Sequence, residues 1–150
     1  MKCISIWQPF ACLLVKGYKI FETRGWAAPP TVIGQRIGIA STKNIKPEQR
    51  AHFASDDFQK FYSALGLPSV LDDMPRGYLL GSVMLDSVEL ITEEFLEDVS
   101  MEEQQYGWFN IGGYAWRMTN PIEYPHPIII RGKQGIFDWH GTPPNEEEVH

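Results

Sequence analysis

The sequence predicts an α+β domain, built as a small mixed β-barrel with short flanking helices. Its 150 residues are enough for one hydrophobic core, which indicates a single domain. Most apolar residues fall in short alternating runs that are separated by glycine and proline, a pattern typical of strands and turns. Helical spacing is confined to a few segments, so helices are expected beside the strands.

Three elements are expected near the N-terminus: a strand over 3–7, a helix over 11–16 and a strand over 20–24. The helix follows Pro9 and stops before Gly17, because proline favours a first helical turn and glycine the position just past an end. In the second strand, successive side chains alternate between faces. Glu22 and Arg24 should therefore share one face.

The rest of the chain contains further strands and one longer helical region. Pro29 and Pro30 interrupt regular pairing, after which alternation returns. Strands are expected over 32–40, 77–90, 114–119, 127–131 and 136–139. The strand over 77–90 should bend near Gly81 or Asp86. The pattern over 46–67 is helical, and 67–76 is expected to be a loop.

Thr92 and Ser100 each occupy an expected helix N-cap. Thr92 precedes a short helical turn through Leu96, and Ser100 with Glu103 has the spacing of a capping box for a second turn. The acidic residues of both turns are expected to face solvent, where they interact favourably with helix N-termini.

Residues 1–140 are interpreted as one domain, in which the helical region at about 44–76 is an insertion. Residues 141–150 are acidic, with two prolines and no apolar pattern. We expect this tail to be disordered.

Composition narrows the class of protein. No apolar run approaches the roughly 20 residues of a membrane span, and the N-terminus lacks the apolar core of a signal peptide. The two cysteines, Cys3 and Cys12, form no disulfide framework, so a cytoplasmic location is expected. The four histidines are scattered and none pairs with a cysteine, so we expect neither a metal site nor a cofactor.

The net charge of −6 argues against nucleic acid by itself, but the charge is unevenly distributed. Residues 1–50 contain eight Lys or Arg and two acids, whereas 51–110 contain two and twelve. An anion-binding patch on an otherwise acidic body suits a nucleotide or a short strand better than a long duplex. The alternative is that these basic residues are ordinary solvated positions.

Functional side chains are densest between residues 7 and 26, where a pocket is expected. Its candidate ligand-binding residues are Trp7, Gln8, Lys19, Glu22, Arg24 and Trp26, with Ser41 and Lys43 on a second wall. A tryptophan can stack on a base, a carboxylate or amide can pair with the polar edge of that base, and cationic groups can hold phosphate. The alternative is a strand-end ion network of Lys19, Glu22 and Arg24 with little energetic weight.

The same stretch resembles the opening signature of ASCH domains, compact β-barrels of the PUA-like superfamily. The signature consists of Trp-Gln-Pro-Phe from Trp7, then Gly-x-Lys-x-x-Glu-x-Arg from Gly17, and then Trp26. Later segments that are similar to further strands of the family lie at 37–43, 77–83, 114–116, 120–121 and 132–137. The resemblance covers about four-fifths of the chain.

The resemblance implies a PUA-like barrel that binds RNA or a nucleotide or nucleoside, with a role in RNA binding or RNA metabolism. It also implies an alternative, because some relatives are small hydrolases. These relatives remove the acetyl group from N4-acetylcytidine with a lysine, a threonine and a glutamate, and ribonuclease activity is associated with the family as well.

In such a hydrolase, Lys19 and Glu22 are the catalytic candidates of this chain. Lys19 takes the place of the family's lysine, but the place of its threonine is occupied by Glu22. Thr23 is one position further along and should face the opposite side of the strand. Asp86 and Glu89 lie in the part of the chain where the third residue is expected.

Overall fold

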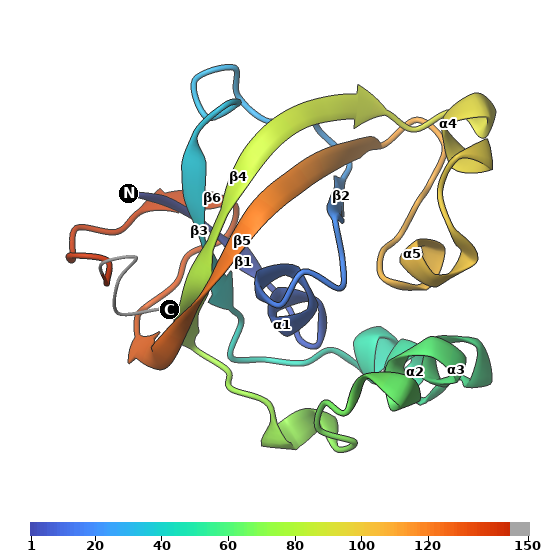
Figure 1. Ribbon diagram of the computed structural model, residues 1–150, viewed down its shortest axis with the longest axis horizontal. Coiled ribbons are helices and arrows are strands. Elements are labelled where there is room, and N and C mark those ends of the chain that lie inside the picture. The colour runs from blue at the N-terminus through green and yellow to red at the C-terminus, as the bar shows by residue number, and fades with distance from the viewer. Residues whose placement is uncertain (145–150) are drawn as a thin grey trace.

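The computed structural model describes residues 1–144, which form one curled six-stranded sheet with flanking helices (Figure 1). The strands are β1 (Lys2–Ile6), β2 (Phe21–Arg24), β3 (Arg36–Ser41), β4 (Tyr78–Leu90), β5 (Tyr114–Ile129) and β6 (Ile136–Asp138). The helices are α1 (Phe10–Val15), α2 (Pro47–Ala54), α3 (Asp56–Tyr62), α4 (Glu93–Glu97) and α5 (Met101–Gln105), with single 3₁₀ turns at η1 (Ser63–Leu65) and η2 (Leu71–Asp73).

The sheet is mixed, with the strand order β2-β5-β4-β3-β1-β6. Strands β1 and β3 run parallel, and every other neighbouring pair is antiparallel. The long strands β4 and β5 arch over α1, which lies within the curve of the sheet (Figure 1). This architecture is a half-barrel of α+β, PUA-like type, so the fold class predicted from the sequence is confirmed.

Helix α1 is the centre of the core because all six of its side chains are buried. It packs on β3, β4 and β5. Burying apolar side chains from a helix and a curved sheet against each other is the main source of stability in a domain of this size. Gly17 follows the helix with a φ of +80°, the left-handed conformation that glycine adopts readily. The predicted helix and its end are therefore confirmed.

Both cysteines are free and buried. Burial raises the pKa of the Cys3 thiol to about 11 and also raises the pKa of the Cys12 thiol, so both side chains act as small apolar groups. Trp116 is a core residue, since its side chain is fully buried and its Nε1 donates to the Trp26 carbonyl. Trp139 is partly buried against a second, smaller apolar cluster.

Three predicted boundaries are wrong. The strand expected over 32–40 begins only at Arg36, because residues 30–34 form a turn in which the Gly34 N–H donates to the Leu85 carbonyl. The helix expected over 46–67 is divided at Ser55, whose extended backbone ends α2 and whose Oγ accepts from the Phe58 N–H to begin α3.

The third correction concerns β5, which is one strand where two were expected. It continues through prolines at positions 121, 125 and 127. Strand β2 pairs with β5 only over 114–117, so the later part of β5 has a free edge on that side. Proline is tolerated on such an edge because no ladder hydrogen bond is lost there. The predicted bend of β4 is confirmed by register shifts after Leu79, Ser82 and Leu85.

The loop expected over 67–76 contains the short turn η2. Among the helices that the structure describes, none is long and apolar enough to cross a membrane. The predicted disordered tail lies largely outside the described residues, since 145–150 are not described.

Candidate functional site

Lys19 is buried, although its position beside a glycine turn allowed it to reach either side of the strand. Its backbone N–H donates to the Leu13 carbonyl at the end of α1, which fixes the residue just before β2. The side chain is 1% exposed. Its Nζ donates to the Tyr106 carbonyl and lies 4.6 Å from the centroid of the Phe10 ring. The ammonium group is thus held by a carbonyl and an aromatic face inside the protein.

Glu22 and Arg24 share one face of β2, as their spacing predicts. Arg24 Nη2 lies 2.9 Å from Glu22 Oε2 and donates to the Ser5 carbonyl at 2.9 Å. The two side chains are 18% and 8% exposed for Arg24 and Glu22, so the pair is mostly removed from water. Arg24 Nε is buried, and within residues 1–144 it has no hydrogen-bond partner. The pair therefore ties the edge strand β2 to β1 but leaves one guanidinium donor uncommitted.

Glu103 is the residue that sequence reasoning missed. Its helix cap is as predicted, because Ser100 Oγ accepts from the Glu103 N–H at 3.0 Å. The Glu103 side chain does not face solvent, however. It is 6% exposed and accepts from the backbone N–H groups of Ile20 and Phe21 at 3.1 Å each. The expectation that every acidic residue of this turn faces solvent is therefore wrong for Glu103. Its carboxylate turns inward because the backbone N–H groups of Ile20 and Phe21, where β2 begins, have no neighbouring strand to accept from them.

Lys19 and Glu103 perturb each other across this buried space. Burial lowers the pKa of Lys19, while the negative charges of Glu22 and then Glu103 oppose that shift. Burial raises the pKa of Glu103, while the charge of Lys19 and the hydrogen bonds from Phe21 and Ile20 oppose the rise. The pKa of Lys19 is thus shifted down and the pKa of Glu103 is shifted up, each in the direction of neutral pH. Such shifts are common among the titratable groups of functional sites.

An aromatic cluster covers Lys19. Trp7 lies 4.3 Å from Phe10 and 6.0 Å from Trp108 between ring centroids, with the two indoles inclined by only 24°. His52 of α2 packs edge-on against Trp108 at 4.5 Å. Trp108 belongs to the α5–β5 loop and is 41% exposed, and Trp26 beyond β2 is 53% exposed. Two large aromatic side chains are therefore partly accessible, and the ring of one of them, Trp26, lies 5.6 Å from the Arg24 guanidinium.

Two of the predicted ligand-binding residues, Gln8 and Ser41, are buried in structural contacts, whereas a third, Lys43, is exposed. Gln8 is fully buried, where it accepts from the Cys12 N–H and donates to the Pro75 carbonyl. Ser41 is buried and its Oγ accepts from the Tyr78 N–H. Lys43 is exposed, and its aliphatic stem lies over Gly77. These residues hold the loop 66–77 against the ends of β1 and β3, and Lys43 alone keeps its charged group in water.

The hydrolase candidates are only partly brought together. Thr23 lies on the face of β2 opposite Glu22, and its Oγ1 accepts from the Trp108 N–H at 3.0 Å. Asp86 and Glu89 are exposed on β4, and neither is among the charges that act on Lys19. The carboxylates that do act on it are Glu22 and Glu103.

Comparison with known proteins agrees with this architecture. A family model for the ASCH domain matches residues 4–128. Activating signal cointegrator 1 of Homo sapiens and of Mus musculus are each 30% identical over 142 residues, which is 90% of this chain. The chain spans only 22% of the length of these relatives.

A crystal structure of an ASCH protein from Zymomonas mobilis superposes with a TM-score of 0.57 at 19% identity. The match covers 98% of this chain and 89% of that one. Two point mutants of the same Zymomonas mobilis protein give TM-scores of 0.54 and 0.53. At such low identity these structures support the fold alone. The family model covers most of the chain, however, and the protein therefore belongs to the ASCH domain family.

Proposed function

We propose that this protein binds single-stranded RNA, or a nucleotide or nucleoside from it, at the site formed by Lys19, Glu22 and Arg24. The observation that carries the proposal is Trp26, an exposed indole whose ring lies 5.6 Å from the Arg24 guanidinium, together with a second exposed indole, Trp108, that stacks near Trp7. Proteins that bind unpaired bases use this combination, with aromatic faces for stacking and a cation for phosphate or a base edge.

Ligand access to Lys19 requires the segment 106–110 to move, because Lys19 is 1% exposed beneath it. Two hydrogen bonds hold this segment in place: Lys19 Nζ donates to the Tyr106 carbonyl, and the Trp108 N–H donates to Thr23 Oγ1 on β2. Both contacts are polar, and each joins residues that lie more than 80 positions apart in the sequence. In the resting arrangement the accessible part of the site is thus Trp7, Trp26, Trp108 and the Arg24 edge, and deeper groups become available only when the loop opens.

The test is fluorescence anisotropy with a short labelled oligouridine at low salt. Replacement Trp26→Ala should weaken binding by about 1–3 kcal/mol, the usual contribution of one stacked base. Ile129→Ala is the control, because Ile129 is 79% exposed on β5 and belongs to no part of the site. The affinity should fall only gradually with salt, since few phosphates are contacted. Equal affinities for the two variants, or no binding at low salt, would contradict the proposal for RNA.

Hydrolysis remains a second candidate function, favoured by one observation: buried Lys19 has a lowered pKa beside two carboxylates. A neutral lysine at this place would act as a general base, with Glu22 or Glu103 as the acidic partner. Incubation with N4-acetylcytidine, followed by the ultraviolet change as the acetyl group leaves, tests this chemistry.

The variant for the hydrolase assay is Lys19→Met, which keeps the buried volume and removes the amine. Its melting temperature must be measured alongside, because the lysine compensates buried carboxylates. Turnover that is lost in a folded Lys19→Met protein would support hydrolysis. Absence of turnover in the unaltered protein would leave binding as the function of the site.

A further inference from the structure

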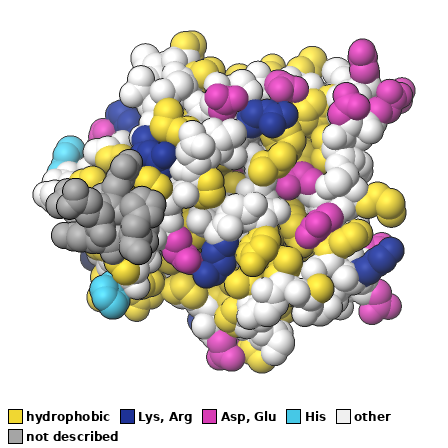
Figure 2. Space-filling model, viewed as in Figure 1, with side chains coloured by type: hydrophobic (Ala, Val, Ile, Leu, Met, Phe, Trp, Pro, Cys, Tyr) yellow, Lys and Arg dark blue, Asp and Glu magenta, His cyan; other side chains and the backbone are white. Residues whose placement is uncertain are grey.

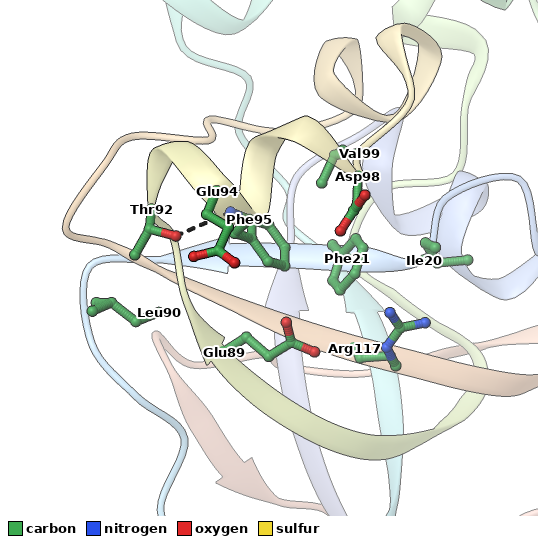
Figure 3. A pocket seen from close by; sticks show the side chains of 10 residues that line it. All are labelled: Ile20, Phe21, Glu89, Leu90, Thr92, Glu94, Phe95, Asp98, Val99 and Arg117. Carbon is green, nitrogen blue, oxygen red and sulfur yellow. Dashed lines mark hydrogen bonds between the residues drawn. The ribbon is translucent and has the colours of Figure 1, made fainter.

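A groove lies on the other face of β2, between that strand, α4 and the ends of β4 and β5 (Figure 3). Its volume is about 420 Å³. Phe21 forms its floor, with Phe95 packed edge-on at 5.4 Å and the Arg117 guanidinium 4.9 Å from the Phe21 ring. Exposed side chains of Ile20 and Leu90 extend the apolar surface at its rim. The groove thus combines an aromatic floor with accessible aliphatic walls.

The charge of the groove is strongly negative. Glu89, Glu94 and Asp98 line it, and all three are exposed. Arg117 is the only Lys or Arg between positions 77 and 130, a stretch that contains nine acids. Figure 2 shows Asp and Glu side chains gathered over α4. The ion pairs found within residues 1–144 involve neither Arg117 nor the three carboxylates, so these charges are uncompensated.

We propose that this groove is a docking site for a basic peptide segment of a partner protein, in which lysine or arginine alternates with aliphatic side chains. Charge complementarity carries the assignment, because the exposed carboxylates of Glu94 and Asp98 on the α4 side match cationic side chains. An aliphatic side chain of the same peptide would pack against Phe95 and the exposed side chains of Ile20 and Leu90 at the rim. The donors of Arg117, on the β5 side (Figure 3), are available to carbonyl oxygens of an extended peptide.

The negative charge of the groove excludes RNA, the ligand proposed for the Glu22–Arg24 face of β2. Three exposed carboxylates repel phosphate, and Arg117 is the single cation in the groove to set against them. This proposal therefore goes beyond RNA binding and does not depend on it. It assigns the two faces of one edge strand to two partners of opposite charge.

The experiment is an NMR titration of the ¹⁵N-labelled protein with a short synthetic peptide of alternating lysine and leucine. Backbone resonances of Phe21, Leu90, Phe95 and Arg117 should shift, and those around Trp7 should not. The variant Glu94→Gln with Asp98→Asn should weaken binding about tenfold, as expected for two exposed ion pairs. The matched control is Asp56→Asn with Asp57→Asn, which removes two exposed acids from the first turn of α3.

Three results would overturn the proposal. One is equal weakening in the control, which would indicate attraction to the overall negative charge. The second is equal binding of a peptide of alternating glutamate and leucine. The third is a short RNA that shifts the groove resonances in place of those around Trp7. Because every readout is a position-specific shift in the folded protein, failure of a variant to fold is recognised in its spectrum.

Discussion

The two faces of β2 have similar numbers of charged groups, but the charges on one face are buried and most of those on the other are exposed. On one side, Glu22 and Arg24 form a mostly buried pair, and the nearby Lys19 and Glu103 are also buried. On the other side, Glu89, Glu94 and Asp98 stay exposed around Phe21 and form no ion pair among the described residues. Buried charges are committed to the fold, whereas exposed unpaired charges are free to interact with a partner.

This difference means that the same substitution should have different consequences on the two sides. The Lys19 side already satisfies most of its polar groups internally, so the RNA binding proposed for it depends mainly on the exposed indoles. The groove has no internal partners for its carboxylates and depends on an external cation. Three measurements test the contrast.

The largest expected effect is on stability. Glu103→Ala should lower the free energy of unfolding by about 3–5 kcal/mol, because it leaves buried Lys19 with less compensation and two β2 N–H groups without an acceptor. Glu94→Ala, in the groove, should change it by no more than about 0.5 kcal/mol. Urea denaturation of both variants is the measurement, and similar losses in the two would remove the distinction between the faces.

The second effect is on pH dependence. Burial raises the pKa of Glu103 in the folded protein above the ordinary glutamate value of 4.5, so between these two pKa values the native state binds more protons than the unfolded state. Its contribution to stability is therefore complete below about pH 4.5 and is lost as pH rises through the folded pKa, at up to about 1.4 kcal/mol per pH unit.

Glu103→Gln should flatten this part of the stability curve, since the amide does not titrate and its oxygen still accepts from β2. Denaturation in urea at a series of pH values measures the effect. An unchanged slope in the Gln variant would show that another group titrates. Lys19 acts with the opposite sign at alkaline pH, because its folded pKa is lowered below 10.5.

The smallest expected effect is that of the groove charges on RNA affinity at the opposite face of β2. Removal of two groove charges in Glu94→Gln with Asp98→Asn should change oligouridine affinity by less than about 0.5 kcal/mol at physiological salt, because both carboxylates are exposed and salt screens interactions between exposed charges. Anisotropy at low and physiological salt measures it. A large gain in RNA affinity would mean that the two faces form one continuous binding surface.

The sequence predicted the elements that depend on local signals. The α1 helix with Gly17 behind it, the caps at Thr92 and Ser100, and the shared face of Glu22 and Arg24 were all correct. The contacts that it did not predict depend on distant segments. Gln8, which was predicted to bind ligand, donates to the Pro75 carbonyl, 67 positions away. Two strands were expected over 114–119 and 127–131, yet β5 runs through both, with its prolines on an edge that β2 does not reach.

Sequence alone therefore determined the family, the mixed sheet and the alternation that separates the two faces of β2, because these follow from local periodicity and from a compact motif. Tertiary structure alone decided that Lys19 is buried and that Glu103 is its companion. The residues that make those contacts, Tyr106 and the β2 backbone, are more than 80 positions from their partners. The burial of a charged group, and therefore its pKa, depends on the residues that the folded chain places around it. A local sequence pattern does not specify those residues.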